Sequence, residues 1–210
     1  MKITEIFFSI QGETTRSGLP TVFIRLTGCP LRCGYCDTSY AFSGGKNYSV
    51  DEIIHQIREY KTKYITVTGG EPLAQPECFV LLKTLCDLNY SVSLETSGAL
   101  DISAVDSRVI KIMDIKTPGS LELSKNKFEN IHYLLPHDQI KFVICNREDY
   151  DWSKKIITQF NLHNKCEILL SPSHPQLNYE KLADWIVEDQ LPVRFQVQLH
   201  KVIWGDIPGK

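Results

Sequence analysis

The chain has 210 residues, of which 42% are hydrophobic and 23% charged, and its formal net charge is −2. This composition is typical of a globular protein with one sizeable core, and the small net charge argues against strong electrostatic binding to nucleic acid. The first residues lack the features of a secretory signal, and no stretch approaches the roughly 20 apolar residues of a membrane span. We expect one cytoplasmic domain spanning 1–210, with no membrane or nucleic-acid partner.

Strand-like and helix-like segments alternate along the chain. Residues 21–28 are typical of a strand with one apolar face, and residues 49–60 are typical of a helix that Ser49 and Glu52 begin as a capping box. Further strands are expected at 64–68, 91–96, 109–115, 140–144, 166–171 and 194–199, with helices at 79–88, near 101–106, near 124–134, at 152–160 and at 179–190.

This alternation predicts parallel strands that are joined by right-handed crossovers. Seven strands in 210 residues fall short of a complete eight-unit barrel, which needs about 250 residues. We therefore expect an α/β fold, a partial TIM-like barrel of about six parallel strand–helix units. An open, doubly wound sheet is the alternative.

Three of the seven cysteines, Cys29, Cys33 and Cys36, lie close together in the segment GCPLRCGYCDT. Structural zinc takes four ligands, a disulfide takes thiols in pairs, and cytosolic thiols stay reduced. Thiolates also hold the irons of an iron–sulfur cluster, and a missing thiolate leaves one iron free to bind a ligand. The spacing therefore favours a cluster with one open iron.

Other unusual residues follow the expected strands, in TGGEP at 68–72, ETSG at 95–98, DIKTPGS at 114–120 and SPSHPQ at 171–176. The carboxyl ends of parallel strands carry the active site, so these segments should converge on one pocket. Gly69 and Gly70 would let a ligand approach the backbone, and Glu71 would suit an ammonium group, although a simple turn is the alternative. The hydroxyls of Thr96 and Ser97 would suit a ribose.

Several polar side chains would also reach this pocket. Asp114 and Lys116 are two residues apart, so they share one face of a strand end, where a plain ion pair is the alternative. Arg25 faces away from the apolar side of its strand, and if it points inward it needs an anion. Asp37 and Thr38 offer oxygen atoms of the kind that magnesium prefers, although a threonine in a turn usually caps backbone.

Two motifs in the expected order, Cys29-x-x-x-Cys33-x-x-Cys36 and Gly69-Gly70-Glu71-Pro72, resemble those of the radical S-adenosylmethionine (SAM) enzymes. More narrowly, the chain is similar to the 7-carboxy-7-deazaguanine synthases. This similarity is carried by FFSIQGE at 7–13, GLPTVFIRLTGC at 18–29, CDTSY at 36–40, VTGGEP at 67–72, LETSG at 94–98 and QLHKVIWG at 198–205. It covers nearly the entire chain.

The resemblance implies a carbon–nitrogen lyase with a [4Fe-4S] cluster, SAM and Mg²⁺. In such enzymes one electron, from a flavodoxin or ferredoxin, cleaves SAM at the open iron, and a 5′-deoxyadenosyl radical takes hydrogen from C6 of 6-carboxy-5,6,7,8-tetrahydropterin. Magnesium-assisted ring contraction with loss of ammonia gives 7-carboxy-7-deazaguanine, which enters queuosine biosynthesis. The resemblance also implies a homodimer.

The resemblance also implies roles for individual residues. Cys29, Cys33 and Cys36 would hold the cluster, Thr38 would bind Mg²⁺, and Arg25 would bind the pterin carboxylate. The full substrate set is Ile10, Gln11, Gly12, Glu13, Arg25 and Thr68, and the SAM set is Tyr35, Gly70, Ser97, Asp114, Ile115, Lys116 and Ser171.

The sequence departs from some family members in two places. It reads Asp114-Ile115-Lys116 where they read Ser-Pro-Lys, so contacts with SAM there can differ. It also continues through Pro208 to Lys210, whereas some members end in a proline whose carboxylate holds the substrate. These departures leave the contacts at both places open.

Two other functions remain open on the sequence. A different radical SAM enzyme, such as a glycyl-radical activase, shares the cysteine spacing and the glycine-rich loop, but FFSIQGE with Arg25 and Thr38 favours a small-molecule site. A non-enzymatic zinc module, with a residue such as His55 as fourth ligand, explains the cysteines but leaves TGGEP, ETSG and Arg25 unexplained.

Overall fold

The computed structural model describes residues 1–207 and 209, so Pro208 and Lys210 lie outside the described residues. Within it, one mixed sheet runs in the order β3-β1-β2-β4-β5-β6-β7-β8-β9. The strands are β1 Lys2–Ile10, β2 Pro20–Leu26, β3 Lys46–Asn47, β4 Tyr64–Gly69, β5 Ser91–Thr96, β6 Ile110–Asp114, β7 Gln139–Ile144, β8 Glu167–Pro172 and β9 Arg194–Phe195. The α-helices are α1 Val50–Ile57, α2 Glu77–Asp87, α3 Arg147–Gln159, α4 Tyr179–Glu188 and α5 Leu199–Trp204.

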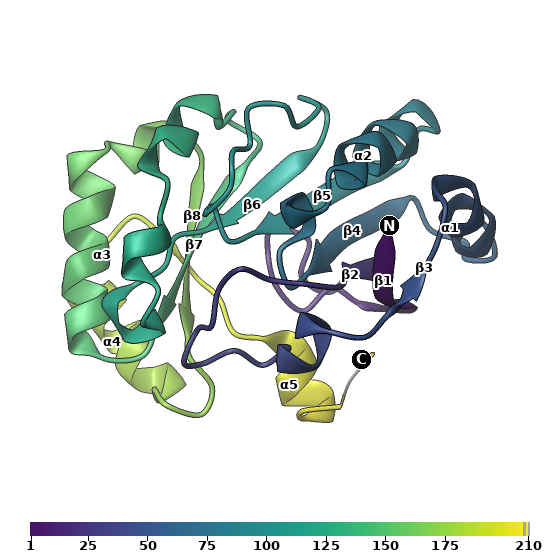
Figure 1. Cartoon of the computed structure of the whole chain (residues 1–210). Helices are drawn as coiled ribbons and strands as arrows, with labels where there is room; N and C mark the ends of the chain where they lie inside the picture. Colours follow the sequence, from purple (N-terminus) through teal and green to yellow (C-terminus); the bar gives the residue numbers. More distant parts are fainter. Residues whose placement is uncertain (208, 210) are drawn as a thin grey trace.

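The parallel strands follow one another in chain order. β2 pairs with β4, and each later strand pairs in parallel with the next, as far as β9. Every crossover therefore moves one place in the same direction, and the helices α1 to α4 lie on the outer side of a curved sheet (Figure 1). The partial-barrel prediction is confirmed, and the doubly wound alternative, which needs a reversal of strand order, is wrong.

Some predicted elements differ from the observed ones. Residues 101–106 form turns rather than a helix, and 124–134 contain short 3-10 helices at Leu123–Lys125 and Phe128–Tyr133. The strand expected at 194–199 is only the two-residue β9, because it lies at the sheet edge and pairs with β8 alone. The strand β1 was not predicted, since it pairs antiparallel with β2 and stands outside the strand–helix alternation.

The apolar core lies between the outer face of the sheet and the helices. Helix α1 shows the pattern: the Glu52 N–H donates to Ser49 Oγ at 3.2 Å and the Ser49 N–H donates to Glu52 Oε2 at 2.7 Å, so the predicted capping box is confirmed. The helix then buries Ile53, Ile54 and Ile57 against the sheet. Within the described residues, no helix is long and apolar enough to span a membrane.

The inner face of the sheet carries many polar side chains beside apolar ones such as Phe23. The segment after β1 covers this face near the amino-terminal ends of the strands. Gln11 Nε2 donates to Thr66 Oγ1 at 3.1 Å, and Thr15 and Gln139 exchange two hydrogen bonds of 2.8 and 3.0 Å. Residues 11–16 therefore fill the barrel between the amino-terminal halves of the strands. Space for a ligand is left only toward their carboxyl ends.

The turn after β4 passes very close to the cysteine segment. The Glu71 N–H donates to the Gly28 carbonyl at 2.8 Å. A Cβ on Gly70 would lie 2.3 Å from the Gly28 oxygen and 2.7 Å from Cys29 Cβ, closer than atoms can pack. A glycine is therefore needed at position 70 for the two loops to meet.

We predict that Gly70→Ala lowers the free energy of unfolding by about 1–3 kcal/mol, because the added methyl group must displace backbone. Denaturant unfolding followed by circular dichroism measures the loss. The matched control is Gly34→Ala, whose added Cβ meets the flexible side chain of Leu121 at 3.3 Å and backbone, the Gly119 carbonyl oxygen, only at an ordinary 3.9 Å. It should change stability by less than about 0.5 kcal/mol, and equal losses in the two variants would contradict the assignment.

Candidate functional site

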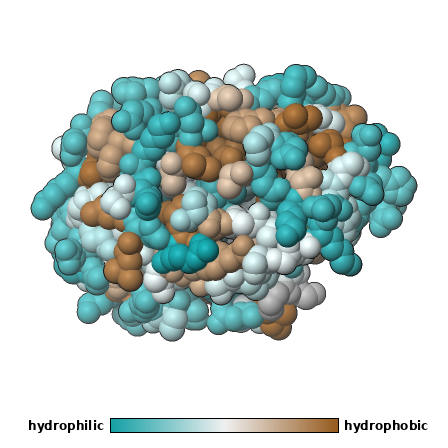
Figure 2. Space-filling view, viewed as in Figure 1, coloured by the Kyte–Doolittle hydropathy of each residue, from teal (hydrophilic) through white to brown (hydrophobic). Residues whose placement is uncertain are grey.

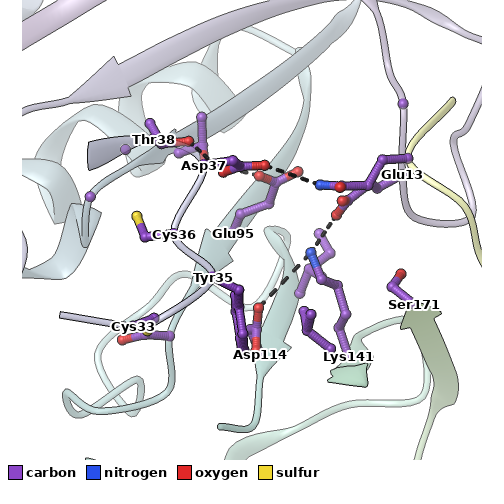
Figure 3. Close-up of a pocket in the computed structure, with 18 of the residues that line it drawn as sticks. Glu13, Cys33, Tyr35, Cys36, Asp37, Thr38, Glu95, Asp114, Lys141 and Ser171 are labelled. Atoms are coloured by element: carbon purple, nitrogen blue, oxygen red, sulfur yellow. Dashed lines mark hydrogen bonds and ion pairs between the residues drawn. The ribbon is translucent and has the colours of Figure 1, made fainter. Parts of the chain in front are cut away.

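A cavity of about 240 Å³ opens at the carboxyl ends of the parallel strands. It is lined by residues of β1, β2, β4, β5, β6, β7 and β8, by loops that follow several of these strands, and by α5. Figure 3 shows ten of these residues labelled. Of the predicted site residues, those that line it are Ile10, Gln11, Gly12, Glu13, Arg25, Cys29, Cys33, Tyr35, Cys36, Thr38, Thr68, Gly70, Ser97, Asp114, Lys116 and Ser171. The segments expected to converge therefore do so.

Ile115 is the predicted site residue that does not line the cavity. Its side chain is 3% exposed and belongs to the apolar core on the opposite face of β6 from Asp114 and Lys116. The period of two that turns those polar neighbours inward turns Ile115 outward. The Ile115 side chain therefore lies away from this cavity.

The cysteine segment forms one wall of the cavity. Cys29, Cys33 and Cys36 are free and half-buried. Arg32 Nη1 donates to the Cys29 carbonyl at 2.8 Å, and the Cys36 N–H donates to the Cys33 carbonyl at 3.1 Å, which fixes the course of the loop. Burial raises the pKa of Cys33 to about 11, so this thiol is protonated at neutral pH while no metal is bound.

The three thiols line the same cavity. Among residues 1–207 and 209, no group of three or more His, Cys, Asp or Glu side chains is close enough to hold a metal ion. A cluster differs from a single ion, because each thiolate binds a different iron, so its three ligands need not approach one another as closely. His55 is an exposed residue of α1 and does not line the cavity, so the zinc alternative lacks the fourth ligand suggested for it.

Three buried polar atoms without a hydrogen bond belong to residues that line the cavity. They are the Tyr35 hydroxyl, the Ser171 hydroxyl and Asp114 Oδ1, for which the described residues supply no hydrogen-bond partner. Lys116 Nζ lies 3.1 Å from Asp114 Oδ1, an ion pair without hydrogen-bond geometry. Such atoms need a partner when buried, so this wall fits a polar ligand that carries donors and acceptors.

Glu71 points away from the cavity. Its side chain is fully buried, and its carboxylate accepts hydrogen bonds from Thr96 Oγ1 at 2.9 Å, from the Ser97 N–H at 2.7 Å and from Ser97 Oγ at 2.5 Å. The expectation that Glu71 holds an ammonium group is therefore wrong. The carboxylate instead fixes the ETSG loop, and so sets where Ser97 borders the cavity.

A buried lysine that the sequence reading missed lies in the middle of the cavity. Lys141 of β7 forms an ion pair with Glu13, and its Nζ lies 3.9 Å from Asp114 Oδ2 (Figure 3). Burial lowers the pKa of Lys141, but the two carboxylates outweigh burial and leave the pKa raised. The sequence does contain a sign of this role, because Lys141 is the one charged residue in the otherwise apolar strand segment IKFVI.

Glu95 of β5 is a second missed residue. Its carboxylate accepts hydrogen bonds from Thr68 Oγ1 at 2.9 Å and from Gln11 Nε2 at 3.5 Å. Burial and the nearby charge of Glu13 raise the pKa of Glu95. The predicted substrate residues Gln11, Glu13 and Thr68 therefore share one network of hydrogen bonds and charges.

Arg25 points into the barrel. Its Nε donates to Glu5 Oε1 at 2.7 Å, and the guanidinium carbon lies 5.7 Å from the centre of the Phe7 ring and 5.9 Å from that of Tyr40. The two terminal nitrogens have no hydrogen-bond partner among the described residues. Arg25 thus presents its two terminal nitrogens to the cavity, while Glu5 holds the guanidinium group at Nε.

The helix α5 closes the cavity from the carboxyl-terminal side. Asp37 Oδ2 pairs with Lys201 Nζ at 3.0 Å, while Asp37 Oδ1 accepts from Thr38 Oγ1 at 2.8 Å. Burial raises the pKa of Asp37, but Lys201 and the hydrogen bonds outweigh burial and hold it well below its usual range. A Cβ on Gly12 would lie 2.0 Å from His200 Nδ1, so only glycine lets α5 pack here.

The chain was compared with known proteins. The model of the Radical SAM superfamily matches residues 23–161. The 7-carboxy-7-deazaguanine synthase of Chlorobaculum tepidum is 43% identical over 98% of this chain and 94% of its own length, and that of Koribacter versatilis is 41% identical over 97% of both chains. The crystal structure of QueE from Escherichia coli covers 95% of this chain and 94% of its own with a TM-score of 0.78.

At 20% sequence identity, the likeness to that crystal structure establishes the shared fold alone. The curated relatives go further, because their identity extends over nearly the whole chain. The chain therefore belongs to the Radical SAM superfamily and, within it, to the 7-carboxy-7-deazaguanine synthase family.

Proposed function

We propose that this chain is a carbon–nitrogen lyase that converts 6-carboxy-5,6,7,8-tetrahydropterin to 7-carboxy-7-deazaguanine, with loss of ammonia, in queuosine biosynthesis. The observation that carries the proposal is the cavity itself. It is lined both by three free cysteines and by the charged and amide groups of Arg25 and Gln11. The names of relatives that match nearly the whole chain support the same reaction.

Membership of the radical SAM superfamily implies a [4Fe-4S] cluster and SAM. Cys29, Cys33 and Cys36 would hold the cluster through their thiolates. When bound, these groups supply the one-electron chemistry that removes a hydrogen atom from a C–H bond of the substrate. Tyr35 and Ser171 support the fit, because their buried hydroxyls gain partners from a polar cofactor beside the cysteines.

Other residues that line the cavity suit a carboxylated pterin. The two terminal nitrogens of Arg25 can donate parallel hydrogen bonds to the two oxygens of a carboxylate. Glu13 and Glu95 can accept hydrogen bonds from the N–H groups along one edge of a pterin ring. Phe7 and Phe23 stack on each other with ring centres 4.9 Å apart, and both border the cavity as a flat apolar surface. This combination favours a small planar acid over a protein substrate.

Thr38 is the residue we assign to Mg²⁺. Its hydroxyl donates to Asp37, so the oxygen lone pairs are left for a hard cation at the cavity wall. A cation here would help to neutralise the substrate carboxylate. Asp37 would then orient the metal ligand while Lys201 holds Asp37 in place.

The working form that we propose is a cytoplasmic homodimer that receives electrons from a flavodoxin or ferredoxin. All seven cysteines are free, as suits a reducing compartment. On α5, Val202 and Ile203 are 60% and 50% exposed, and such apolar side chains suit contact with a second copy.

The direct test is anaerobic reconstitution with iron and sulfide, followed by incubation with the pterin, SAM, Mg²⁺ and a reductant. The wild type should form 7-carboxy-7-deazaguanine. Cys33→Ala should bind little iron and form no product, yet keep the circular dichroism of the wild type, because the loop lies outside the apolar core. An intact cluster without product, or stoichiometric zinc without iron, would sink the proposal.

Arg25→Gln should raise the KM for the pterin roughly 10- to 100-fold, because a charged hydrogen bond to a carboxylate contributes about 1.5–3 kcal/mol. SAM binding, measured by calorimetry, should stay unchanged. The control is Arg108→Gln, which removes an exposed arginine paired with Asp87 and Asp106. If both variants raise KM equally, Arg25 does not bind the substrate.

Thr38→Ala should weaken the magnesium dependence of turnover while SAM affinity stays the same. Thr38→Ser keeps the hydroxyl and should restore the magnesium response. The measurement is the Mg²⁺ concentration at half-maximal rate for the three proteins. An identical value in the alanine variant would remove Thr38 as a ligand.

A further inference from the structure

We propose that Glu5 is a positioning residue, which orients the guanidinium group of Arg25 toward the carboxylate of the substrate, and that a β-bulge in β1 aims Glu5 at Arg25. The inference rests on the proposed function for the identity of the substrate. Arg25 lines the cavity and Glu5 does not, so Glu5 acts through Arg25 and not by contact with the substrate.

The register between β1 and β2 shifts by one residue at Thr4. Ile3 lies opposite Leu26, whereas Glu5 lies opposite Arg25, so two steps along β1 correspond to one step along β2. Thr4 is therefore the extra residue of a β-bulge, a feature that can aim a side chain at an active site. In an unbroken strand, Ile3 and Glu5 would point to the same face of the sheet.

The bulge lets the start of β1 serve both faces of the sheet. Ile3 is 2% exposed and belongs to the apolar core together with Leu26. Phe7, two residues after Glu5, lines the cavity on the other face, as does Arg25 opposite Glu5. Without the extra residue, either Ile3 would lose its place in the core or Glu5 would turn away from Arg25.

Contacts with the loops after β2 and β4 hold the bulge in place. The hydroxyls of Thr4 and Thr27 share a hydrogen bond of 2.7 Å, and the Thr27 N–H donates to the Lys2 carbonyl at 3.0 Å. Gln75 Nε2 donates to the carbonyls of Lys2 and Thr27 at 2.8 and 2.9 Å. None of these bonds involves the Glu5 side chain, so the bulge should persist when Glu5 is replaced.

Glu5 restricts Arg25 while leaving its two terminal nitrogens for a ligand. Arg25 Nε donates to Glu5 Oε1 at 2.7 Å, and the Tyr40 hydroxyl donates to the same oxygen at 2.8 Å. The rings of Phe7 and Tyr40 also contact the guanidinium group. A free arginine side chain loses much rotamer freedom on binding, so an arginine that is already held binds a carboxylate at a lower cost.

The charge of Glu5 opposes the binding that its hydrogen bond assists. A carboxylate beside Arg25 partly cancels the attraction of the guanidinium group for the carboxylate of the substrate. If charge alone mattered, removal of Glu5 would strengthen binding of the pterin. If orientation matters, removal of Glu5 weakens binding although the charge of the site becomes more favourable.

The first measurement is binding and turnover of the carboxylated pterin by the reconstituted enzyme. Glu5→Ala should raise KM, and the Kd from calorimetry, by about 5- to 20-fold, which is part of the loss expected for Arg25→Gln. Glu5→Gln keeps an oxygen that accepts from Arg25 Nε, so it should restore both constants to within about threefold of the wild type. Affinity for a tetrahydropterin without the carboxylate should be equal in wild type, Glu5→Ala and Glu5→Gln.

Glu167→Ala is the matched control. Glu167 also accepts a hydrogen bond from the Nε of an arginine on the neighbouring strand, Arg194, at 2.8 Å, and neither residue lines the cavity. This variant should leave KM within about twofold of the wild type. In an Arg25→Gln background, Glu5→Ala should raise KM by less than about twofold further, because the group that Glu5 orients is already absent.

The order of the Arg25 side chain can be measured without substrate, by nuclear magnetic resonance of the reconstituted, ¹⁵N-labelled enzyme. The Arg25 Nε–H should exchange with water at least about tenfold more slowly in the wild type and in Glu5→Gln than in Glu5→Ala. Its signal is assigned by its loss in Arg25→Gln. Hydrophobic side chains stand among hydrophilic ones on the face of the molecule in Figure 2, which suits the protein concentration that this measurement needs.

The proposal is overturned if Glu5→Ala leaves pterin binding unchanged or strengthens it, or if KM rises equally with and without Arg25. Equal exchange rates of the Arg25 Nε–H in the wild type and Glu5→Ala would also overturn it. Should Glu5→Ala fail to fold, Glu5→Asp takes its place with the same expected results, because the shorter side chain withdraws the carboxylate from Arg25.

A wild type that binds no pterin, or forms no 7-carboxy-7-deazaguanine, contradicts the proposed function instead. The exchange rates then still decide whether Glu5 orders Arg25.

Discussion

The polar inner face of the parallel strands is the constraint on which the rest of the structure depends. Side chains alternate along each strand, so the apolar residues that hold the helices leave polar ones, such as Thr66 and Gln139, pointing into the barrel. Buried polar groups need partners, and residues 11–16 supply them in the lower half. Toward the carboxyl ends of the strands, the charged network around Lys141 supplies partners for some of the polar groups. Others, such as the Tyr35 hydroxyl, have no partner among the described residues and can bind a ligand.

The cysteine loop depends on contacts from both sides. The backbone turn at Gly70 supports its beginning, and the segment with Ser120 and Glu122 supports its middle. Glu71, one residue after that turn, ties the ETSG loop to the same place. Three loops that follow different strands are therefore fixed relative to one another by hydrogen bonds within the described residues.

The sequence allowed the repeated part of this fold to be predicted, because each strand and helix carries its own local pattern. The spacing of Asp114 and Lys116 was enough to place both on one face. Elements that depend on distant partners were predicted poorly. β1, which is defined by its antiparallel neighbour, was missed, and the strand at 194–199 was predicted too long because it has no second strand to pair with. The orientation of the Glu71 side chain depends on hydrogen-bond donors at the end of a different strand, so the sequence around Glu71 does not reveal it.

Residues of the site were predictable where a motif marked them and not otherwise. Lys141 and Glu95 stand inside ordinary strand patterns, and their importance appears only when the inner face proves to be a cavity.

The carboxyl-terminal helix contributes to the site but not to the apolar core, unlike the helices α1 to α4. α5 buries none of its residues in the core, yet it holds Asp37 through Lys201 and lies against Gly12 through His200. The stability of the fold is therefore largely independent of the helix that completes the site. A chain that lost its last turn to proteolysis would keep its barrel and its spectroscopic signature of folding, but one wall of the chamber would be gone.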